Sequence, residues 1–390
     1  MPINNKLLKL NDKLKFLIAC SQTDPSEEDI EFIHSTLDSE HLTSNALISL
    51  ANQHGILPLV YKTIKNLPHI AHHTHEDFLT DLKSAYRQIS QQNMLMSAEL
   101  IRVMKLFEEN NIEALAFKGP ALSQMAYGDI TLRQYNDLDV LIKQEDRDKI
   151  SKILESQGYE QVLMLTSVQE KNWYKHVKDM SLFHLQKGIH IELHWLLLDN
   201  DYPIQVDLSS IWEYPQSVVI NRQKVQTFPN ESLLLYLCIH GSKHLWERIE
   251  WIKDIDLIIR TQTIDWELVA EQVNKSGFER MFLLGLYLSN TLFQTPLPTI
   301  FIQQMKHQKW LIKLSDFVIN DWKQHRGMFH NSLAMRHLFP RIKMQLHYLY
   351  QIILKPSKNE YRFVDLPKGL YWVYYLIRPY LLIKKYITKN

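Results

Sequence analysis

The sequence predicts an α+β protein in which a compact unit of strands and short helices lies between two helical regions. Apolar residues recur at helical spacing through the N-terminal part and again from Glu231 onward, whereas strand-like alternation is confined to 112–228. The 390 residues include only ten glycines, which indicates few tight turns and much helix. We therefore expect an N-terminal helical region at 1–98, an α+β core at 99–228 and a C-terminal helical domain at 229–390.

The N-terminal region is predicted to contain several amphipathic helices. Apolar residues form short helical blocks between 24 and 67. Between 76 and 110 they recur mostly three or four positions apart, as in one or two long helices, and Asn110-Asn111 provides a stop. The loop between these segments holds four histidines without a convincing cysteine or acidic partner, so metal binding there is the lesser alternative: His69, His72, His73 and His75.

The central unit is predicted to begin with a strand at 112–117, which passes through Lys118-Gly119-Pro120 into a helix that ends before Gly128. The next segments again change between strand and helix periodicity. They are a strand at 137–142, a helix at 144–157, a β-hairpin at 180–195 and a strand pair at 218–228.

Asp137 and Asp139 are the first residues whose pattern indicates chemistry. They stand two positions apart on the predicted strand, so both carboxylates point to one face, while Leu138 and Val140 point to the other. Adjacent carboxylates repel each other, and a bound divalent cation is the usual way to offset the repulsion. Because the ligands are hard oxygens, the pair predicts a Mg²⁺ or Mn²⁺ site rather than a Zn²⁺ site.

Glu192 is the candidate for a third acid. In the segment IHIELHW (189–195) the apolar residues alternate with His190, Glu192 and His194, so these three polar side chains share one face of a strand. An acid and two histidines on one face are unusual if that face only packs against a core. The alternative is the solvent-exposed face of an edge strand.

Lys118 and Gly119 lie at the first strand-to-helix turn of the core. A glycine there allows the backbone to approach a phosphate, and a helix N-terminus favours negative charge. Pro120 fits the first turn of the helix but lacks one N–H donor. Alone, this turn is weak evidence, since Lys118 is also explained as a surface charge and Gly119 as a turn residue.

The order of these features resembles the nucleotidyltransferase superfamily that includes DNA polymerase beta, and the detailed sequence is more similar to the bacterial family of uncharacterised nucleotidyltransferases. The resemblance covers about residues 100–260 and implies a small mixed sheet as the core. The stretches that carry it are FKGPAL (117–122), YGD (127–129), Arg133, NDLDVLI (136–142), IELHW (191–195), LCIHGSKH (237–244) and WIKDID (251–256).

The resemblance implies transfer of a nucleoside monophosphate from an NTP to an acceptor. Asp137 and Asp139 would hold two metal ions, Mg²⁺ or Mn²⁺, with Glu192 as the third acid. One metal ion would activate the acceptor hydroxyl and the other would neutralise the triphosphate. Glu192 would either bind the metal ion on the acceptor side or take the proton, and the sequence leaves both roles open.

The glycine turn departs from the superfamily pattern. Gly119 is followed by proline instead of serine or glycine, and eighteen positions separate Gly119 from Asp137, where about a dozen are usual. We therefore expect Lys118 and Arg133 to take over part of the phosphate binding.

A second polar group is predicted on the helix that follows the core. His240, Lys243 and His244 fall on one face of that helix. They are candidates for contacts with the nucleotide base or phosphates over the active site. The equally weighted alternative is a structural role in helix capping and in an ion-pair network with Asp254 and Asp256.

The bulk composition limits the partners. Forty-four basic and forty-three acidic residues leave a net charge of +1, which gives no overall attraction to nucleic acid. We expect a small molecule as acceptor, with a protein or an RNA end as the alternative. A second class is a non-catalytic nucleotide-binding or partner-binding module that keeps the fold, and a third is an all-helical interaction protein.

The chain is expected to be cytoplasmic. Its first fifteen residues lack the apolar stretch of a signal peptide, and no apolar run reaches the length of about 18 residues that a membrane span needs. The nearest approach is the C-terminal segment 370–383, which Arg378-Pro379 interrupts and Lys384-Lys385 follows. A packed terminal helix is the simpler interpretation of this segment, and an anchor at a membrane surface is the alternative.

Overall fold

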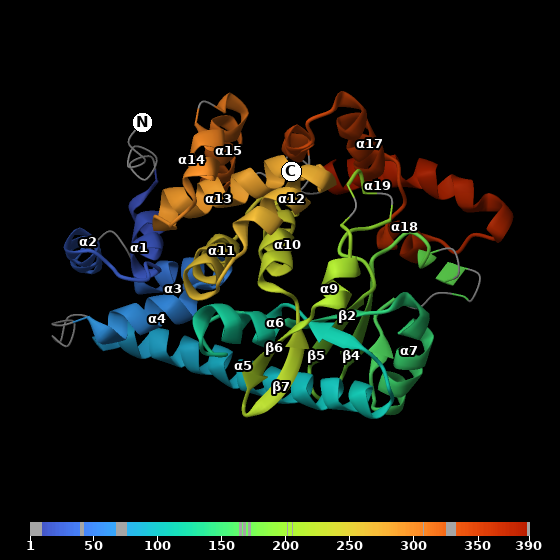
Figure 1. Ribbon diagram of the computed structural model, residues 1–390, viewed down its shortest axis with the longest axis horizontal. Helices are drawn as coiled ribbons and strands as arrows, with labels where there is room; N and C mark the ends of the chain where they lie inside the picture. Colours follow the sequence, from blue (N-terminus) through green and yellow to red (C-terminus); the bar gives the residue numbers. More distant parts are fainter. Residues whose placement is uncertain are drawn as a thin grey trace.

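The computed structural model is an α+β protein, as the sequence predicts (Figure 1). The structure describes residues 10–39, 43–67, 76–163, 166, 169–170, 173–200, 202–204, 206–306, 308–324 and 333–387. The four histidines between 69 and 75 lie outside these residues.

Two sheets make up the β structure of the described residues. The larger is mixed: β2 and β5 run parallel at its centre and the outer pairs are antiparallel, in the order β1-β2-β5-β4-β3. The smaller is a hairpin whose two turn residues, Asn221 and Arg222, both have the positive φ that such two-residue turns require. The strands are β1 (Ala114–Ala116), β2 (Asp137–Ile142), β3 (Glu160–Gln161), β4 (Asp179–His184), β5 (Ile189–His194), β6 (Gln216–Ile220) and β7 (Gln223–Thr227).

Helices precede and follow the strands in the sequence, and shorter ones lie between them. The N-terminal helices are α1 (Asp12–Cys20), α2 (Glu27–Leu37), α3 (Ser44–Gln53), α4 (Leu57–Asn66) and α5 (Glu76–Glu109). The core adds α6 (Gly119–Leu122), the π-helical turn η4 (Ser123–Tyr127), η5 (Gln144–Asp146), α7 (Arg147–Ser156) and α9 (Ser209–Glu213). The C-terminal part holds α10 (Asn230–Lys243), α11 (Ile249–Thr261), α12 (Trp266–Ser276), α13 (Glu279–Phe293), α14 (Thr299–Met305), α15 (Lys309–Gln324), η6 (Arg336–Leu338), α17 (Ile342–Ile353), α18 (Lys358–Phe363), η7 (Lys368–Val373) and α19 (Tyr374–Ile387).

The long helix α5 covers one face of the large sheet. It has no glycine or proline in its 34 residues, and its C-terminal half carries an apolar stripe that packs against the inward side chains of β2 and β5, such as Val140 and Leu193. Figure 1 shows α5 running along the base of the molecule, with α10 and α11 on the opposite side of the core. The second face of the sheet, which carries the acids, is therefore turned toward the C-terminal helices. α5 is also continuous through position 98, where the sequence analysis divides the chain.

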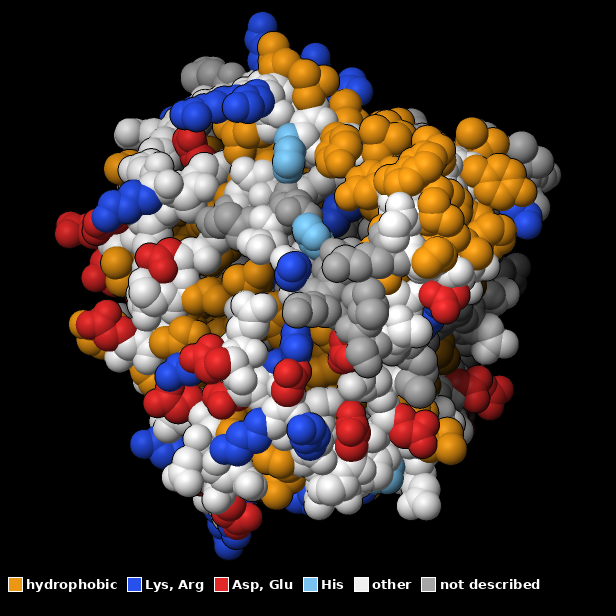
Figure 2. All heavy atoms as spheres, turned by 90° about the vertical axis from the view of Figure 1, so that its right-hand side faces the viewer, with side chains coloured by type: hydrophobic (Ala, Val, Ile, Leu, Met, Phe, Trp, Pro, Cys, Tyr) orange, Lys and Arg blue, Asp and Glu red, His pale blue; other side chains and the backbone are white. Residues whose placement is uncertain are grey.

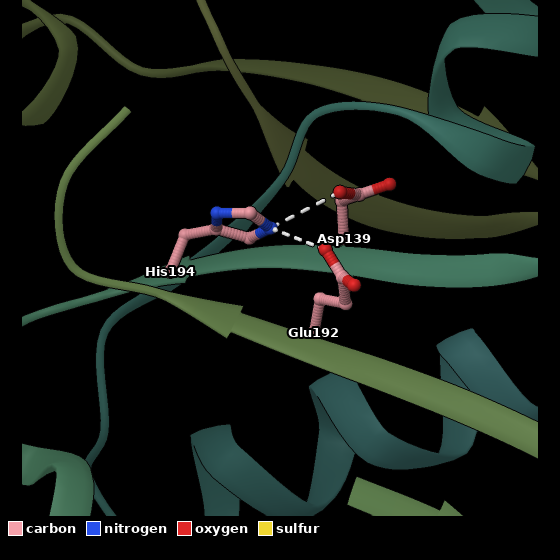
Figure 3. Close-up of side chains that lie close together, drawn as sticks. All are labelled: Asp139, Glu192 and His194. Atoms are coloured by element: carbon pink, nitrogen blue, oxygen red, sulfur yellow. Dashed lines mark hydrogen bonds and ion pairs between the residues drawn. The ribbon is translucent and has the colours of Figure 1, made fainter. Parts of the chain in front are cut away.

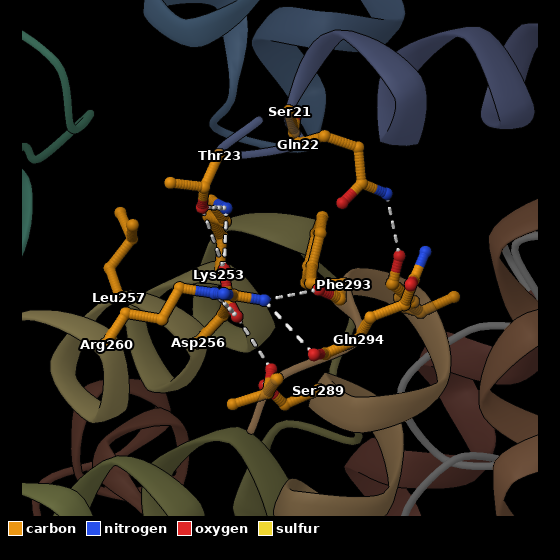
Figure 4. Close-up of polar contacts among 12 residues, drawn as sticks. Ser21, Gln22, Thr23, Lys253, Asp256, Leu257, Arg260, Ser289, Phe293 and Gln294 are labelled. Atoms are coloured by element: carbon orange, nitrogen blue, oxygen red, sulfur yellow. Dashed lines mark hydrogen bonds and ion pairs between the residues drawn. The ribbon is translucent and has the colours of Figure 1, made fainter. Parts of the chain in front are cut away.

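A second hydrophobic cluster joins the N-terminal helices to the C-terminal ones, and a buried polar network lies within it (Figure 4). Asp256 of α11 accepts hydrogen bonds from Lys253 (2.7 Å) and Arg260 (2.7 Å). Lys253 also donates to the hydroxyl of Thr23 after α1, and the side chain of Gln22 donates to the carbonyl of Leu292 in α13. These contacts fix the segment after α1 against α11 and α13, and they give the buried Lys253 and Asp256 specific partners.

Among the described residues, no helix combines the length and the apolar character required to cross a membrane.

Candidate active site

The acids lie side by side on the two parallel strands at the centre of the sheet. In the register of β2 with β5, Asp137 is opposite His190 and Asp139 is opposite Glu192. Partners in register have their side chains on the same face, so Asp137, Asp139 and Glu192 share one face. On the other face, Leu138 and its apolar neighbours are buried against α5. The strand alternation expected from the sequence thus separates a polar face from a packed one.

Asp139 is the centre of the polar contacts on this face. One carboxylate oxygen, Oδ1, lies 3.0 Å from the Lys118 ammonium and 3.1 Å from Nε2 of His194. Figure 3 shows the side chains of Asp139, Glu192 and His194 pointing toward one another, with Glu192 Oε2 3.4 Å from the same His194 nitrogen. The second oxygen, Oδ2, is buried and has no hydrogen-bond partner among the described residues. A buried carboxylate oxygen without a donor is costly unless a further ligand binds it.

The residues fit a divalent cation. Asp139, Glu192 and His194 each offer one ligand atom, and these atoms lie within 4.8 Å of one another. Carboxylate oxygens suit Mg²⁺ and Mn²⁺, and imidazole is a ligand of transition metals rather than of Mg²⁺. The group differs from the predicted set in that it includes His194 but not Asp137, which stands two positions before Asp139 on β2. The strand alternation predicts the correct face for His194, but nothing in the sequence pattern distinguishes it as a site residue.

The pKa values of the three acids are shifted in different directions. Repulsion by Asp139, together with burial, raises the pKa of Asp137 to about 6. The hydrogen bond with His194 lowers the pKa of Glu192 to about 2. Burial alone would raise the pKa of Asp139, but Lys118 and His194 outweigh it and the net shift is downward. Lys118 and the hydrogen bonds with His194 thus favour the ionised forms of Asp139 and Glu192, whereas Asp137 and Asp139 repel each other, which favours cation binding.

A cleft of about 390 Å³ opens over this face. Of the nine residues proposed from the sequence, eight line it, and only Gly119 does not. The cleft also contains residues that the sequence analysis did not select, namely Lys178, Asp179, His194, Tyr236, Arg248 and Glu250. Lys178 and Asp179 could not be found from the pattern because they enter the site through the register of β4 with β5, in which Asp179 lies opposite His194.

Three lysines give the cleft a positive side. Lys118 contacts Asp139, and Lys178 contacts both Asp179 and Nδ1 of His194. Burial and the nearby charge of Lys178 lower the pKa of Lys243. Ammonium groups that crowd one another in this way favour an anionic ligand, and a phosphate is the anion that lysines most often bind in such clefts.

The aromatic groups on α10 and α11 form the opposite wall. The ring of His240 lies 4.8 Å from that of His244 and 5.2 Å from that of Trp251. Burial lowers the pKa of His240 well below its ordinary value and that of His244 to about 3, so both rings are neutral near neutral pH. The ion-pair alternative does not describe these histidines, because Asp254 and Asp256 pair with other residues.

Arg133 is held in a buried ion pair. Its Nε and Nη2 donate to the two oxygens of Asp254, each at 2.9 Å, and Nη1 donates to the carbonyl of Gln134. The hydroxyl of Tyr127 donates to the same carboxylate at 2.8 Å. Arg133 lines the cleft. Its ion pair with Asp254 joins the segment before β2 to α11.

Gly119 has a structural role next to the site. Its φ is +52°, and a Cβ atom there would lie 3.2 Å from the carbonyl oxygen of Asp137. We expect Gly119→Ala to lower the free energy of unfolding by about 2–3 kcal/mol, through the left-handed backbone and the close contact with β2. Gly128 (φ +69°) is the matched control: a Cβ there meets nothing, so Gly128→Ala is expected to cost only about 1 kcal/mol. Urea denaturation measures both values, and equal costs would show that the contact with β2 is unimportant.

Glu250 gives the folded protein a pH-dependent stability. It is 1% exposed, and burial is the main cause that raises its pKa to about 7, against the opposing charges of Arg133 and Arg248. The raised pKa means that the folded state binds a proton more tightly than the unfolded state, so this stabilisation is present at low pH and is lost as the pH rises through about 7.

Between about pH 5 and pH 8 we expect the free energy of unfolding of the wild type to fall by about 3 kcal/mol relative to Glu250→Gln. Glutamine keeps the acceptor for the backbone N–H of Gln134, which lies 2.8 Å from Glu250 Oε1. Urea denaturation of both proteins across this range provides the measurement. Parallel pH profiles would show that the carboxyl titrates normally.

The fold and the site together define a nucleotidyltransferase: an α+β core with acids on two adjacent strands, facing a cleft closed by helices. The chain belongs to the family described as uncharacterised nucleotidyltransferase, whose sequence pattern matches residues 40–294. A search of curated proteins gave no match.

Three solved structures were also found to be similar. A lincomycin-bound lincosamide antibiotic adenylyltransferase, LnuA, shares 18% identity over 35% of this chain and 83% of its own, with a TM-score of 0.26. The antibiotic-resistance factor ANT(2'')-Ia shares 13% identity over 47% of this chain and 88% of its own, with a TM-score of 0.31. An antigenic nucleotidyltransferase-like protein from Paracoccidioides brasiliensis shares 18% identity over 52% and 93%, with a TM-score of 0.31. With TM-scores this low, none of these proteins assigns an acceptor to the chain.

Proposed function

We propose that this protein transfers a nucleoside monophosphate from an NTP to a hydroxyl group of a small molecule, with Mg²⁺ or Mn²⁺ held by Asp137, Asp139 and Glu192. The observation that carries the proposal is the unpartnered Oδ2 of Asp139, which is buried beside Glu192 at the wall of a cleft. An oxygen in this position has the chemistry of a cation ligand. The lysines of the same cleft supply the charge that a triphosphate requires.

Each wall of the cleft has a part in this proposal. A bound divalent cation would lower the pKa of the acceptor hydroxyl and neutralise charge on the phosphates. Lys118, Lys178 and Lys243 bind and orient the phosphate groups, and Arg133 contributes from the edge of the cleft. His240 and His244, which are neutral rings next to Trp251, contact the base.

Glu192 keeps two candidate roles, as a ligand of the cation or as the group that accepts the proton of the acceptor. The low pKa that His194 imposes on Glu192 supports the ligand role, because a carboxylate that is always ionised is a weak base near neutral pH. His194 holds Asp139 and Glu192 in place, since one of its nitrogens lies close to both.

A small acceptor is supported by the size of the cleft. Pockets of about 300–1,000 Å³ take small ligands, and this cleft of about 390 Å³ lies at the lower end of that range. The net charge of +1 gives no electrostatic reason for a long nucleic acid. Transfer to a protein or to an RNA end is the alternative within the same chemistry, and in either case the C-terminal helices from α10 onward shape the acceptor side.

Isothermal titration of ATP, GTP, CTP and UTP in the presence of Mg²⁺ or Mn²⁺ tests the proposal. We expect metal-dependent binding of at least one nucleotide, which the double variant Asp137→Ala/Asp139→Ala abolishes, and the bound nucleotide then serves as donor in an acceptor screen. The variant's circular dichroism spectrum and melting curve establish that it is folded. Nucleotide binding without turnover on any acceptor would favour a non-catalytic binding module, and absence of binding to folded wild-type protein would contradict the proposal.

A further inference from the structure

Exposed apolar side chains are concentrated at the C-terminal end of the described chain. Of 21 large hydrophobic residues that are exposed among the described residues, 11 lie between 342 and 383. This segment makes up about a tenth of the chain, so single exposed residues distributed at random do not explain it.

Helix α17 presents one stripe of these residues. Ile342, Leu346, Tyr350 and Leu354 recur at every fourth position and are 74%, 61%, 45% and 38% exposed. Tyr348, on the opposite side of the helix, is buried against Phe339 with its ring 5.0 Å away. α17 therefore packs through one side and leaves an apolar side exposed.

Helix α19 and the turn before it present a second stripe. Trp372, Leu376, Tyr380 and Ile383 follow one another at helical spacing and are each more than half exposed. The inner side of α19 is held by Tyr374, which is fully buried and donates to the carbonyl of Val364.

The two stripes belong to one rigid surface. Arg378 of α19 donates to the carbonyl of Ile352 at the end of α17 and to the hydroxyl of Ser357 at the start of α18. It also pairs with the buried Glu360 of α18, 3.4 Å away. Figure 2 views the molecule from the side where α17, α18 and α19 lie in Figure 1, and it shows hydrophobic side chains gathered into one large patch.

The same segment carries a strong positive charge. Residues 341–390 contain ten Lys and Arg but only two Asp and Glu, so the rest of the chain is acidic although the whole carries only +1. Of the two acids, Glu360 is buried in the contact with Arg378. Arg341, Lys343, Arg362 and Lys384 are exposed next to the apolar stripes.

We propose that the face formed by α17, α18, η7 and α19 binds the surface of a membrane that contains anionic lipids. Apolar side chains flanked by lysine and arginine are the pattern of a surface that lies in the headgroup region. Trp372 and Tyr380 fit this position, because tryptophan and tyrosine combine an apolar ring with a polar group and are enriched in the headgroup region. No spanning helix is needed for this mode of binding.

The charge selects this partner over a second copy of the chain. Two copies that met through this face would bring two strongly basic segments together, and repulsion between them would oppose the contact. An anionic bilayer attracts the same charges and receives the apolar side chains at the same time. The proposal is independent of the proposed function, because none of the residues that line the cleft belongs to this face.

Flotation of the full chain with lipid vesicles tests the proposal. One set of vesicles contains phosphatidylcholine alone, and the other contains phosphatidylcholine and phosphatidylglycerol in equal amounts. We expect the protein to float with the anionic vesicles and to bind them at least about tenfold more tightly than the neutral ones, with the difference reduced by salt. The double variant Leu346→Ser/Leu376→Ser is expected to lower binding at least about tenfold, because two apolar side chains no longer insert.

The matched control is Leu185→Ser/Ile300→Ser, which changes two residues that are 75% and 56% exposed and lie outside this face. It is expected to bind as the wild type does, and melting curves verify that both variants are folded. Lack of binding to anionic vesicles, or equal losses in the two double variants, would overturn the proposal. So would a wild-type dimer that Leu346→Ser/Leu376→Ser converts to a monomer without any vesicle binding, since the face would then belong to a contact between copies.

Discussion

Asp139→Asn is expected to lower the rate of nucleotidyl transfer by at least about 10³-fold. The substitution keeps the shape of the side chain but removes the charge that faces Lys118 and His194 and the oxygen proposed as a cation ligand. We expect the affinity for Mn²⁺ to fall with the rate, as measured by isothermal titration of the metal alone. Asp81→Asn, which changes an exposed acid on α5, is the control for general charge effects.

Glu192→Gln, studied beside Asp139→Asn, separates the two roles that Glu192 can have. As a ligand, its loss weakens Mn²⁺ binding, and excess metal restores part of the rate. As a proton acceptor, its loss leaves Mn²⁺ binding intact and flattens the acid limb of the pH–rate profile. An Asp139→Asn enzyme with most of its activity would contradict the assignment of the site to this end of β2 and β5.

The sequence was sufficient to place the acids because a strand has a fixed period. Two residues at positions i and i+2 must share a face, so Asp137 with Asp139, and Glu192 with His194, were paired without knowledge of the fold. The same rule predicted the buried partners, and Leu138 and Leu193 are indeed in the core. The resemblance to a known family then supplied what periodicity lacks, the expectation that Asp137, Asp139 and Glu192 belong to one site on a small mixed sheet.

The parts of the site that escaped prediction depend on packing between distant segments. Lys178 and Asp179 reach His194 because of the register between β4 and β5. A shift of one residue in this register would have turned their side chains to the other face of the sheet. Arg133 and Asp254 are 121 positions apart, and a list of motifs does not show that they form a pair. Glu250 has an ordinary acidic side chain in the sequence, and only its burial gives it an unusual pKa.

Asp254→Ala is expected to lower the free energy of unfolding by about 3–5 kcal/mol, because it leaves the guanidinium of Arg133 buried without its carboxylate. The double variant Arg133→Met/Asp254→Leu is expected to regain most of this stability, since two apolar side chains replace both charges at once. Urea denaturation gives the values. Asp256→Ala is the control on the same helix, because it breaks the contacts with Lys253 and Arg260, none of which lines the cleft.

The double variant also decides whether Arg133 binds phosphate. A guanidinium has five N–H donors, and the contacts with Asp254 and Gln134 use three of them, so donors remain for a ligand in the cleft. We expect Arg133→Met/Asp254→Leu to bind nucleotide at least about tenfold more weakly than Asp256→Ala does, although the Arg133→Met/Asp254→Leu variant is the more stable of the two. If nucleotide affinity instead returns together with stability, Arg133 acts only through the position of α11, and Lys118, Lys178 and Lys243 must hold the phosphates alone.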